Sequence, residues 1–184
     1  MTQTKPYNII DCSQVEVQEW LKETDICLVP IGSCEQHGNH LPLRTDSITA
    51  EVITGRAAKR AHVPHTPLVW AGYSPQHMRE VGSGAGTITF RSSTYQAVLY
   101  DIGRSLIHHG FNKIIYVTGH GSNIKVLDPM LRNLRYETHA FIAMYKAYSE
   151  RDLSLVQDII ENPKDETPGW HCSEMETAQD MAYD

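Results

Sequence analysis

The sequence predicts an α/β fold built around a mainly parallel sheet, and the order of its apolar and amphipathic segments carries this prediction. Short apolar runs recur along the chain, and each is closed by glycine or by a polar residue, as buried parallel strands are. Segments with apolar residues at helical spacing alternate with these runs, which is the order expected when helices cover the faces of a parallel sheet. The predicted strands are 26–31, 66–72, 113–118 and 140–145.

Helices are expected between these strands because the intervening segments repeat apolar residues at helical spacing. Ser13 is a suitable N-cap for the first helix, and Gly110 is a suitable stop for the third. The polar stretch 149–167 predicts an exposed helix and loop that interrupts the alternation. The expected helices are 12–24, 47–62, 92–110 and 123–135.

Composition and charge narrow the class of protein. With 184 residues, of which 41% are hydrophobic, the chain is long enough for a single domain spanning 1–184. A formal net charge of −6 without any Lys/Arg run argues against nucleic acid or an anionic membrane as partner. No membrane span and no signal peptide are predicted. The four cysteines show no CxxC spacing, so we expect free thiols and a cytoplasmic location.

The loop that follows the strand predicted at 26–31 carries the side chains of a candidate metal site. Glu35 and His37 are two residues apart and Asp46 follows nine later, which gives one imidazole and two carboxylates, a set that suits Zn or Mn. Residues after such a strand emerge at the edge of the sheet where α/β proteins bind ligands. Two plainer interpretations stay open: a polar surface loop with one incidental histidine, and Asp46 as a simple helix cap.

A fourth candidate ligand lies at the end of the strand predicted at 113–118. His120 stands there between two glycines and would reach the same edge of the sheet. A lone histidine in such a place is more often a hydrogen-bonded core residue. His108 and His109 end a predicted helix and are interpreted as partners of its dipole, outside the site.

Residues 30–46, PIGSCEQHGNHLPLRTD, closely resemble the signature of the creatininase (creatinine amidohydrolase) family of dinuclear metal hydrolases. Further segments resemble the same family in the same order. The resemblance implies a three-layer α/β/α sandwich around a mainly parallel sheet, a small-molecule substrate and a homo-oligomer, a hexamer in the family. The further segments are 72–78 with 86–89, 118–123, and 171–177.

The resemblance also implies two divalent ions, Zn and/or Mn with Fe as an alternative. Glu35, Asp46 and His120 would hold one ion, while His37, Asp46 and Glu176 would hold the other, with Asp46 bridging. Two ions about 3.5–4 Å apart can share a hydroxide that attacks a carbonyl carbon. His171 matches the family's histidine near the leaving group, which implies general acid and base catalysis; a structural histidine is the alternative.

Several departures from the family pattern bear on the substrate. Ser122 stands where creatinine-cleaving members are expected to carry glutamate, so creatinine itself is not the expected substrate. The glycine-rich run 82–86 replaces the family's usual Phe-Pro-Gly-Thr and is interpreted as a mobile lid or turn, since no phosphate-binding pattern follows it. Family members usually run some tens of residues further at the C-terminus, so a final strand or helix of the family could be missing here. Candidate substrate-binding residues are Arg44, Tyr73, His77 and Trp170.

Three functions follow from these observations. The first is a metal-dependent amidohydrolase that opens a small cyclic amide or cleaves a related C–N bond. The second keeps the metal site but hydrolyses a C–C bond in a cyclic keto-polyol, since the same hydroxide can attack a ketone. The third is a metal-binding relative without catalysis. Release of an amine separates the first two.

The choice between Glu174 and Glu176 as ligand depends on where the last helix begins. A helix beginning at His171 would place Glu174 on the same face as that histidine. The pattern Ser173-x-x-Glu176 is instead typical of a capping box, which would begin the helix at Ser173 and leave His171 in the preceding loop. The family's spacing between His171 and Glu176 favours Glu176, with a purely capping glutamate as the alternative.

Overall fold

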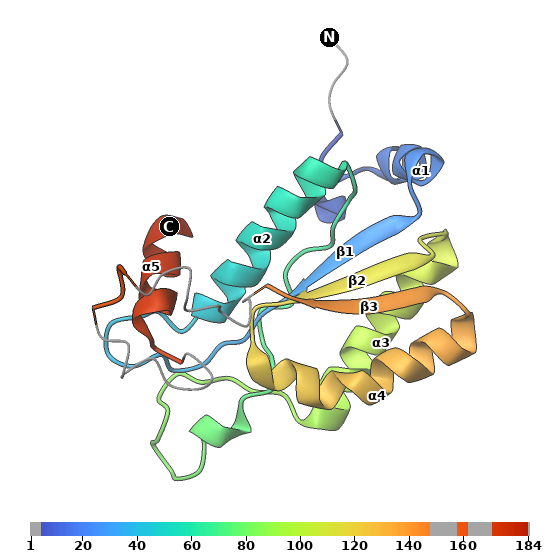
Figure 1. Ribbon diagram of the computed structural model, residues 1–184. Helices are drawn as coiled ribbons and strands as arrows, with labels where there is room; N and C mark the ends of the chain where they lie inside the picture. Colours follow the sequence, from blue (N-terminus) through green and yellow to red (C-terminus); the bar gives the residue numbers. More distant parts are fainter. Residues whose placement is uncertain (1–4, 148–157, 162–170, 184) are drawn as a thin grey trace.

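The strands of the protein form one parallel sheet in a computed structural model that describes residues 5–147, 158–161 and 171–183. β1 (Ile26–Ile31), β2 (Lys113–Thr118) and β3 (Phe141–Lys146) lie in the order β1-β2-β3 (Figure 1). The register pairs Ile31 with Thr118 and Thr118 with Lys146, so the carboxyl ends of the strands are level. The loops that leave β1 and β2 therefore start side by side. Most of the stretch 149–167 lies outside the described residues.

Helices cover both faces of this sheet. Figure 1 shows α2 over one face and α3 with α4 against the other, which confirms the α/β/α layering. α5 packs beside α2. The helices are α1 (Gln14–Glu23), α2 (Thr45–Ala61), α3 (Ser92–His109), α4 (Gly121–Thr138) and α5 (Glu174–Tyr183), with short 3-10 turns η1 (Ile9–Asp11) and η2 (Pro75–His77).

The predicted helix boundaries are confirmed where a capping residue defines them. Ser13 caps α1 in a capping box with Glu16, and Gly110 ends α3 with a φ of 113°, a left-handed conformation that costs glycine little. α2 and α4 each begin two residues before the predicted start, at Thr45 and Gly121. No capping side chain marks these two starts, so the spacing of apolar residues alone could not define them.

The strand predicted at 66–72 is wrong. This segment runs parallel beside β1 but makes only isolated bridges, one of them between Ile31 and Val69. Pro30 of β1 faces the segment and has no N–H to donate, although its carbonyl accepts from the Val69 N–H at 3.0 Å. The Thr66 N–H donates to the Leu28 carbonyl. The next bond is two residues further in β1, at Pro30, but three residues further in the segment, at Val69, so one extra residue breaks the regular ladder.

The two faces of the sheet bury different cores. The larger core lies between the sheet and the α3–α4 layer and includes Leu99, Tyr116 and Leu134, all fully buried. The Tyr116 hydroxyl donates to the Leu99 carbonyl at 2.8 Å, so the one polar atom of this ring is satisfied. The smaller core lies under α2 and includes Leu28 and Val117. Together they fix the strands that carry the site.

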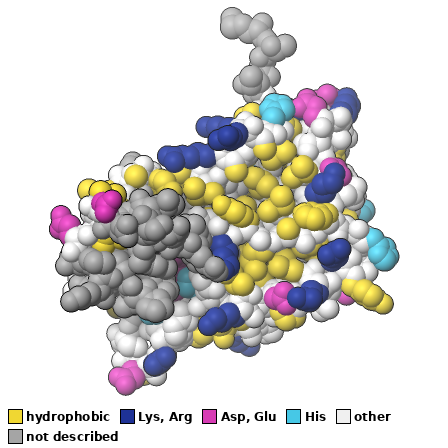
Figure 2. All heavy atoms as spheres, in the orientation of Figure 1, with side chains coloured by type: hydrophobic (Ala, Val, Ile, Leu, Met, Phe, Trp, Pro, Cys, Tyr) yellow, Lys and Arg dark blue, Asp and Glu magenta, His cyan; other side chains and the backbone are white. Residues whose placement is uncertain are grey.

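Beyond α2, the same face of the sheet is open in the described part of the chain. Figure 2 shows hydrophobic side chains gathered on this side of the molecule, with lysine and arginine around them. Phe141 and Tyr145 of β3 are 54% and 57% exposed. Among the described residues, none of the helices is long and apolar enough to cross a membrane.

Candidate metal centre

The level carboxyl ends of β1 and β2 bring the candidate ligands together, and a buried asparagine fixes the loops that carry them. The Asn123 amide donates to the Gly32 carbonyl at 3.0 Å and to Thr118 Oγ1 at 3.3 Å, and its oxygen accepts from the Tyr73 N–H at 3.1 Å. One fully buried side chain thus joins the loop after β1, the end of β2 and the loop before η2. A fully satisfied buried amide of this kind makes the surrounding backbone rigid.

His120 lies between two buried carboxylates. Its Nδ1 is 2.9 Å from Asp46 Oδ2 and 3.4 Å from Glu35 Oε1. The other ring nitrogen, Nε2, donates to the Tyr73 carbonyl at 3.1 Å. In the neutral ring, Nδ1 therefore presents a lone pair to the carboxylates, as a metal-binding histidine does.

His37 repeats this arrangement on the other side of Asp46. Its Nδ1 donates to the carbonyl of Glu35 at 3.0 Å, so the lone pair of the neutral ring is on Nε2. That atom lies 3.6 Å from Asp46 Oδ1 and 3.8 Å from Glu176 Oε2. His37 Nε2 is buried and has no hydrogen-bond partner among the described residues.

The last helix brings Glu176, not Glu174, into this group. Ser173 Oγ accepts the Glu176 N–H at 3.2 Å, so α5 begins after Ser173 and His171 lies in the preceding turn. Glu176 Oε2 accepts the Cys172 N–H at 2.6 Å, which holds the carboxylate over His37. Glu174 points away from this group, and both its oxygens lie 3.1 Å from the backbone nitrogen of Glu161.

The electrostatics of the group show how strongly its members interact. Burial opposes the charged form of Asp46, but the His120 and His37 rings hold the pKa of this carboxyl well below its usual range. Burial likewise opposes charge on His37 and His120, yet Asp46 raises both pKa values to about 9. Burial and the charge of Asp46 raise the pKa of Glu35 to about 7.

These residues fit a divalent metal ion. Atoms of Glu35, Asp46 and His120 lie within 4.8 Å of one another and are all buried. His37 and Glu176 form a neighbouring group that also includes His171, and His37 Nε2 links it to Asp46. The unpartnered Nε2 of His37 would cost free energy in a site without a cation, because buried polar atoms are normally paired. Two imidazoles and three carboxylates form a donor set that suits Zn or Mn.

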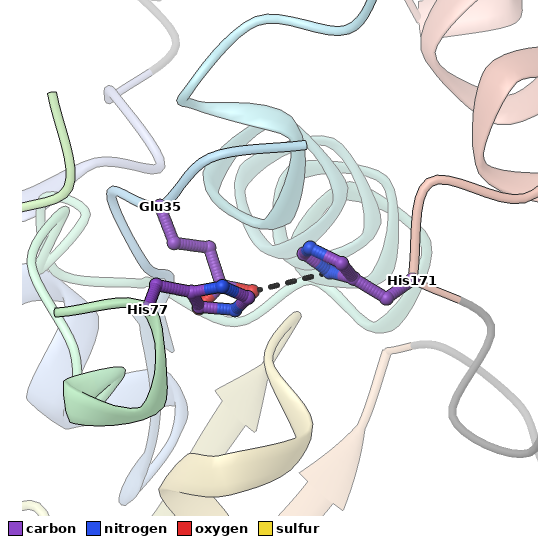
Figure 3. Close-up of side chains that lie close together, drawn as sticks. All are labelled: Glu35, His77 and His171. Atoms are coloured by element: carbon purple, nitrogen blue, oxygen red, sulfur yellow. Dashed lines mark ion pairs between the residues drawn. The ribbon is translucent and has the colours of Figure 1, made fainter. Parts of the chain in front are cut away.

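A cavity of about 450 Å³ opens from this group. His77 and His171 line it, and their rings stack with centroids 4.8 Å apart. Figure 3 shows both rings beside Glu35: His171 Nδ1 is 3.5 Å from Oε1 and His77 Nε2 is 3.7 Å from Oε2. Burial and nearby His37 lower the pKa of His171 to about 4, and burial lowers that of His77.

The other predicted substrate-binding residues lie differently. Arg44 is exposed at the start of α2 and does not line the cavity. The Tyr73 side chain packs against the core, and only its carbonyl reaches the site. Trp170 lies outside the described residues.

Three polar residues near the site were not predicted from the sequence: Gln36, Gln76 and Lys125. Gln76 and Lys125 line the cavity, and Gln36 contacts both His77 and His171. Gln36 stands inside the loop motif between two candidate ligands, and this position was the signal available for it. Lys125 lies one turn into α4 and carries no motif of its own.

Comparison with known proteins identifies hydrolases among the relatives of this chain. The chain is 35% identical over 119 residues to the mycofactocin precursor peptide peptidase of Mycobacterium ulcerans, and 29% over 116 residues to the creatinine amidohydrolase of Pseudomonas putida. These alignments cover 60% of this chain and 46% and 45% of the two relatives. The chain is 24% identical over 172 residues to the 3-dehydro-scyllo-inosose hydrolase of Thermotoga maritima, covering 91% of this chain and 53% of that protein.

Solved structures share the fold. A crystal structure of creatinine amidohydrolase (creatininase) matches with a TM-score of 0.80 at 24% identity, covering 97% of this chain and 73% of the other. The chain spans about half the length of the curated relatives it matches. The creatininase family model, described as creatinine amidohydrolase, matches residues 11–184. Because that match takes in nearly all of the chain, this protein belongs to the creatininase family.

Proposed function

We propose that the protein is a metal-dependent hydrolase that cleaves an amide C–N bond in a small molecule, with a cyclic amide as the preferred class. The observation that carries this proposal is the set formed by buried Glu35, His37, Asp46 and His120 with half-buried Glu176, in which His37 Nε2 has no hydrogen-bond partner among the described residues. Solved relatives described as "Creatininase Mn" and "Zn-Zn type" support a metal-dependent activity.

Two divalent ions fit the candidate ligands. Glu35, Asp46 and His120 would hold one ion, and His37 and Glu176 would hold the second together with Asp46. When bound, such ions lower the pKa of water and polarise a carbonyl group. Asp46 is suited to the shared position because its two oxygens face different histidines, Oδ2 toward His120 and Oδ1 toward His37.

The chain's own groups would bind and orient the substrate. His171 lies at the cavity wall between the Glu35 carboxylate and the last helix, so it is the candidate for a side chain that assists cleavage. Its side chain is 32% exposed and can meet a substrate that enters from solvent. Lys125 adds a cation to the cavity lining, which favours a substrate with a carboxylate or another electron-rich group.

The relatives support a hydrolytic reaction, but their names imply that they hydrolyse different kinds of bond. They include mycofactocin precursor peptide peptidases, a creatinine amidohydrolase and a 3-dehydro-scyllo-inosose hydrolase. Ser122 lines the cavity here, where creatinine-cleaving members are expected to carry glutamate. Hydrolysis of a cyclic ketone is the second candidate, favoured by the alignment of 91% of this chain with the inosose hydrolase.

Chelation followed by a substrate panel tests the proposal. Protein dialysed against a strong chelator should lose turnover, and Zn²⁺ or Mn²⁺ should restore it. The panel holds cyclic amides, short peptides and cyclic ketones, with amine release and carboxylate release measured separately. Amine release supports the first candidate, and carboxylate without amine supports the second. Full activity in metal-free protein, or no turnover of any compound by metal-loaded protein, would contradict both.

A further inference from the structure

The side chain of Gln36 lies between the two histidines of the cavity wall, and its orientation is fixed by the backbone. Its Oε1 accepts the Gly38 N–H at 3.0 Å. A flipped amide would bring its own NH₂ against that N–H, and two donors cannot bond each other. Gly38 has a φ of 68°, a left-handed conformation that glycine adopts at little cost.

The amide nitrogen of Gln36 therefore faces the two rings as a donor. Nε2 lies 2.9 Å from His77 Nδ1 and 3.2 Å from His171 Nε2. An NH₂ group has two hydrogens, which is one for each ring. Both receiving nitrogens must carry a lone pair, so neither ring is an imidazolium ion. The stacking of the rings, with planes only 26° apart, agrees with two neutral imidazoles.

The hydrogen of each neutral ring must then be on its other nitrogen. These are His77 Nε2 and His171 Nδ1, the two atoms directed toward Glu35 and the cavity. His77 and His171 would otherwise resemble metal ligands, since one atom of each lies within 4.8 Å of a Glu35 oxygen, and His171 also forms such a group with His37 and Glu176. A metal ion would need lone pairs where the two rings carry hydrogens, so a third ion does not fit.

We propose that Gln36 is a positioning residue that holds His77 and His171 as neutral hydrogen-bond donors to an oxygen atom of the substrate. The role in substrate binding rests on the proposed hydrolase function, whereas the positions of the hydrogens do not. In this arrangement His171 presents the Nδ1 hydrogen to the cavity, because its Nε2 accepts from the Gln36 amide. Fixed N–H donors stabilise negative charge that develops on a substrate oxygen.

Histidine tautomers can be measured directly by NMR. In zinc-loaded protein labelled with ¹⁵N-histidine, long-range ¹H–¹⁵N spectra should show His77 protonated at Nε2 and His171 at Nδ1. His77→Gln and His171→Gln assign the two sets of signals. The opposite tautomer at either ring, or a zinc-bound nitrogen in either, would overturn the proposal.

Two matched variants test whether Gln36 is the cause. Gln36→Glu presents only acceptors to the rings and should move hydrogens to His77 Nδ1 and His171 Nε2. Gln76→Glu adds the same charge at the wall of the cavity, where Gln76 contacts Ser122 and not a ring nitrogen, and should leave both tautomers unchanged. Unchanged tautomers in Gln36→Glu would exclude the positioning role.

Kinetics separate this inference from the proposed function. Gln36→Met removes the donor while keeping the length of the side chain, and should lower kcat by about 10²-fold without loss of zinc. An unchanged kcat would overturn the substrate-binding role of the two rings. If the wild-type tautomers are as expected but no compound of the panel is hydrolysed, the hydrolase proposal fails and the hydrogen positions stand.

Discussion

At the residue scale, the four histidines around Glu35 differ in which ring nitrogen is held by a fixed partner. Backbone carbonyls accept from His37 and His120, which turns the lone pairs of the neutral rings toward the carboxylates. The Gln36 amide donates to His77 and His171, which turns their hydrogens inward. Ligands and hydrogen-bond donors are therefore distinguished by the partner on the outer side of each ring, a distinction that sequence spacing does not contain.

Glu176 and Glu174 offer a matched pair of substitutions for the metal site. Glu176→Gln should lose about one ion per chain, because a neutral amide replaces the carboxylate that lies 3.8 Å from His37 Nε2. Glu174→Gln should keep both ions, since that side chain contacts a backbone N–H outside the site. Metal analysis after gel filtration measures both. The reverse result would move the ligand to Glu174.

At the scale of elements, the site depends on how closely the end of β2 approaches the start of α2. A Cβ at Gly119 would lie 1.9 Å from the carbonyl oxygen of Asp46, which is a backbone atom that cannot rotate away. Gly119→Ala should therefore separate the two elements, at a cost of about 1–3 kcal/mol in the free energy of unfolding. It should also weaken metal binding, because His120 follows directly. Chemical denaturation and zinc titration measure the two effects.

Gly55→Ala is the control for that substitution. Gly55 lies within α2, and a Cβ there meets nothing within 4 Å. Alanine in mid-helix should stabilise the protein by about 0.5–1 kcal/mol and leave zinc affinity unchanged. Equal effects of the two substitutions would show that the loss at Gly119 comes from removing a glycine and not from the contact with Asp46.

The elements that the sequence predicted best are those with a local chemical marker. Ser13 and Gly110 define helix ends through a cap and a left-handed residue, and the Ser173 pattern indicated the start of α5. The strand expected at 66–72 failed because its pairing depends on Pro30, a residue of the neighbouring strand. Apolar runs predict burial, whereas ladder formation also requires donors on the facing strand.

At the scale of the whole molecule, the candidate ligands come from the loop after β1, the first turn of α2, the end of β2 and the last helix. The motif around Glu35 could be predicted because its members are close in sequence. The position of Gln36 within that motif marked it as a neighbour of the ligands, but its contact with His171 depends on the fold, as does the place of Lys125 in the cavity. The sequence therefore predicts ligands that lie in one loop motif better than it predicts cavity residues that come from distant segments.

Because the ligands join distant elements, metal binding should stabilise the whole fold. An ion at a hundredfold excess over its Kd adds about 2.7 kcal/mol to the free energy of unfolding. α5 should gain the most protection from hydrogen exchange, because its candidate ligand Glu176 would be tied through the ion to His37 in the loop after β1. α3 supplies no candidate ligand and serves as the internal control.

This stabilisation should grow with pH. The pKa values of His37 and His120 are raised to about 9 in the metal-free site, so below that pH an ion must displace their protons. Affinity then increases as pH rises toward 9, and the zinc-induced increase in Tm should be larger at about pH 8.5 than at about pH 6.5. The pKa of Glu35, raised to about 7, acts in the same direction. Calorimetry with and without zinc at both pH values measures the difference. An increase in Tm that is independent of pH, or that persists in a variant with both histidines replaced, would mean that zinc binds elsewhere.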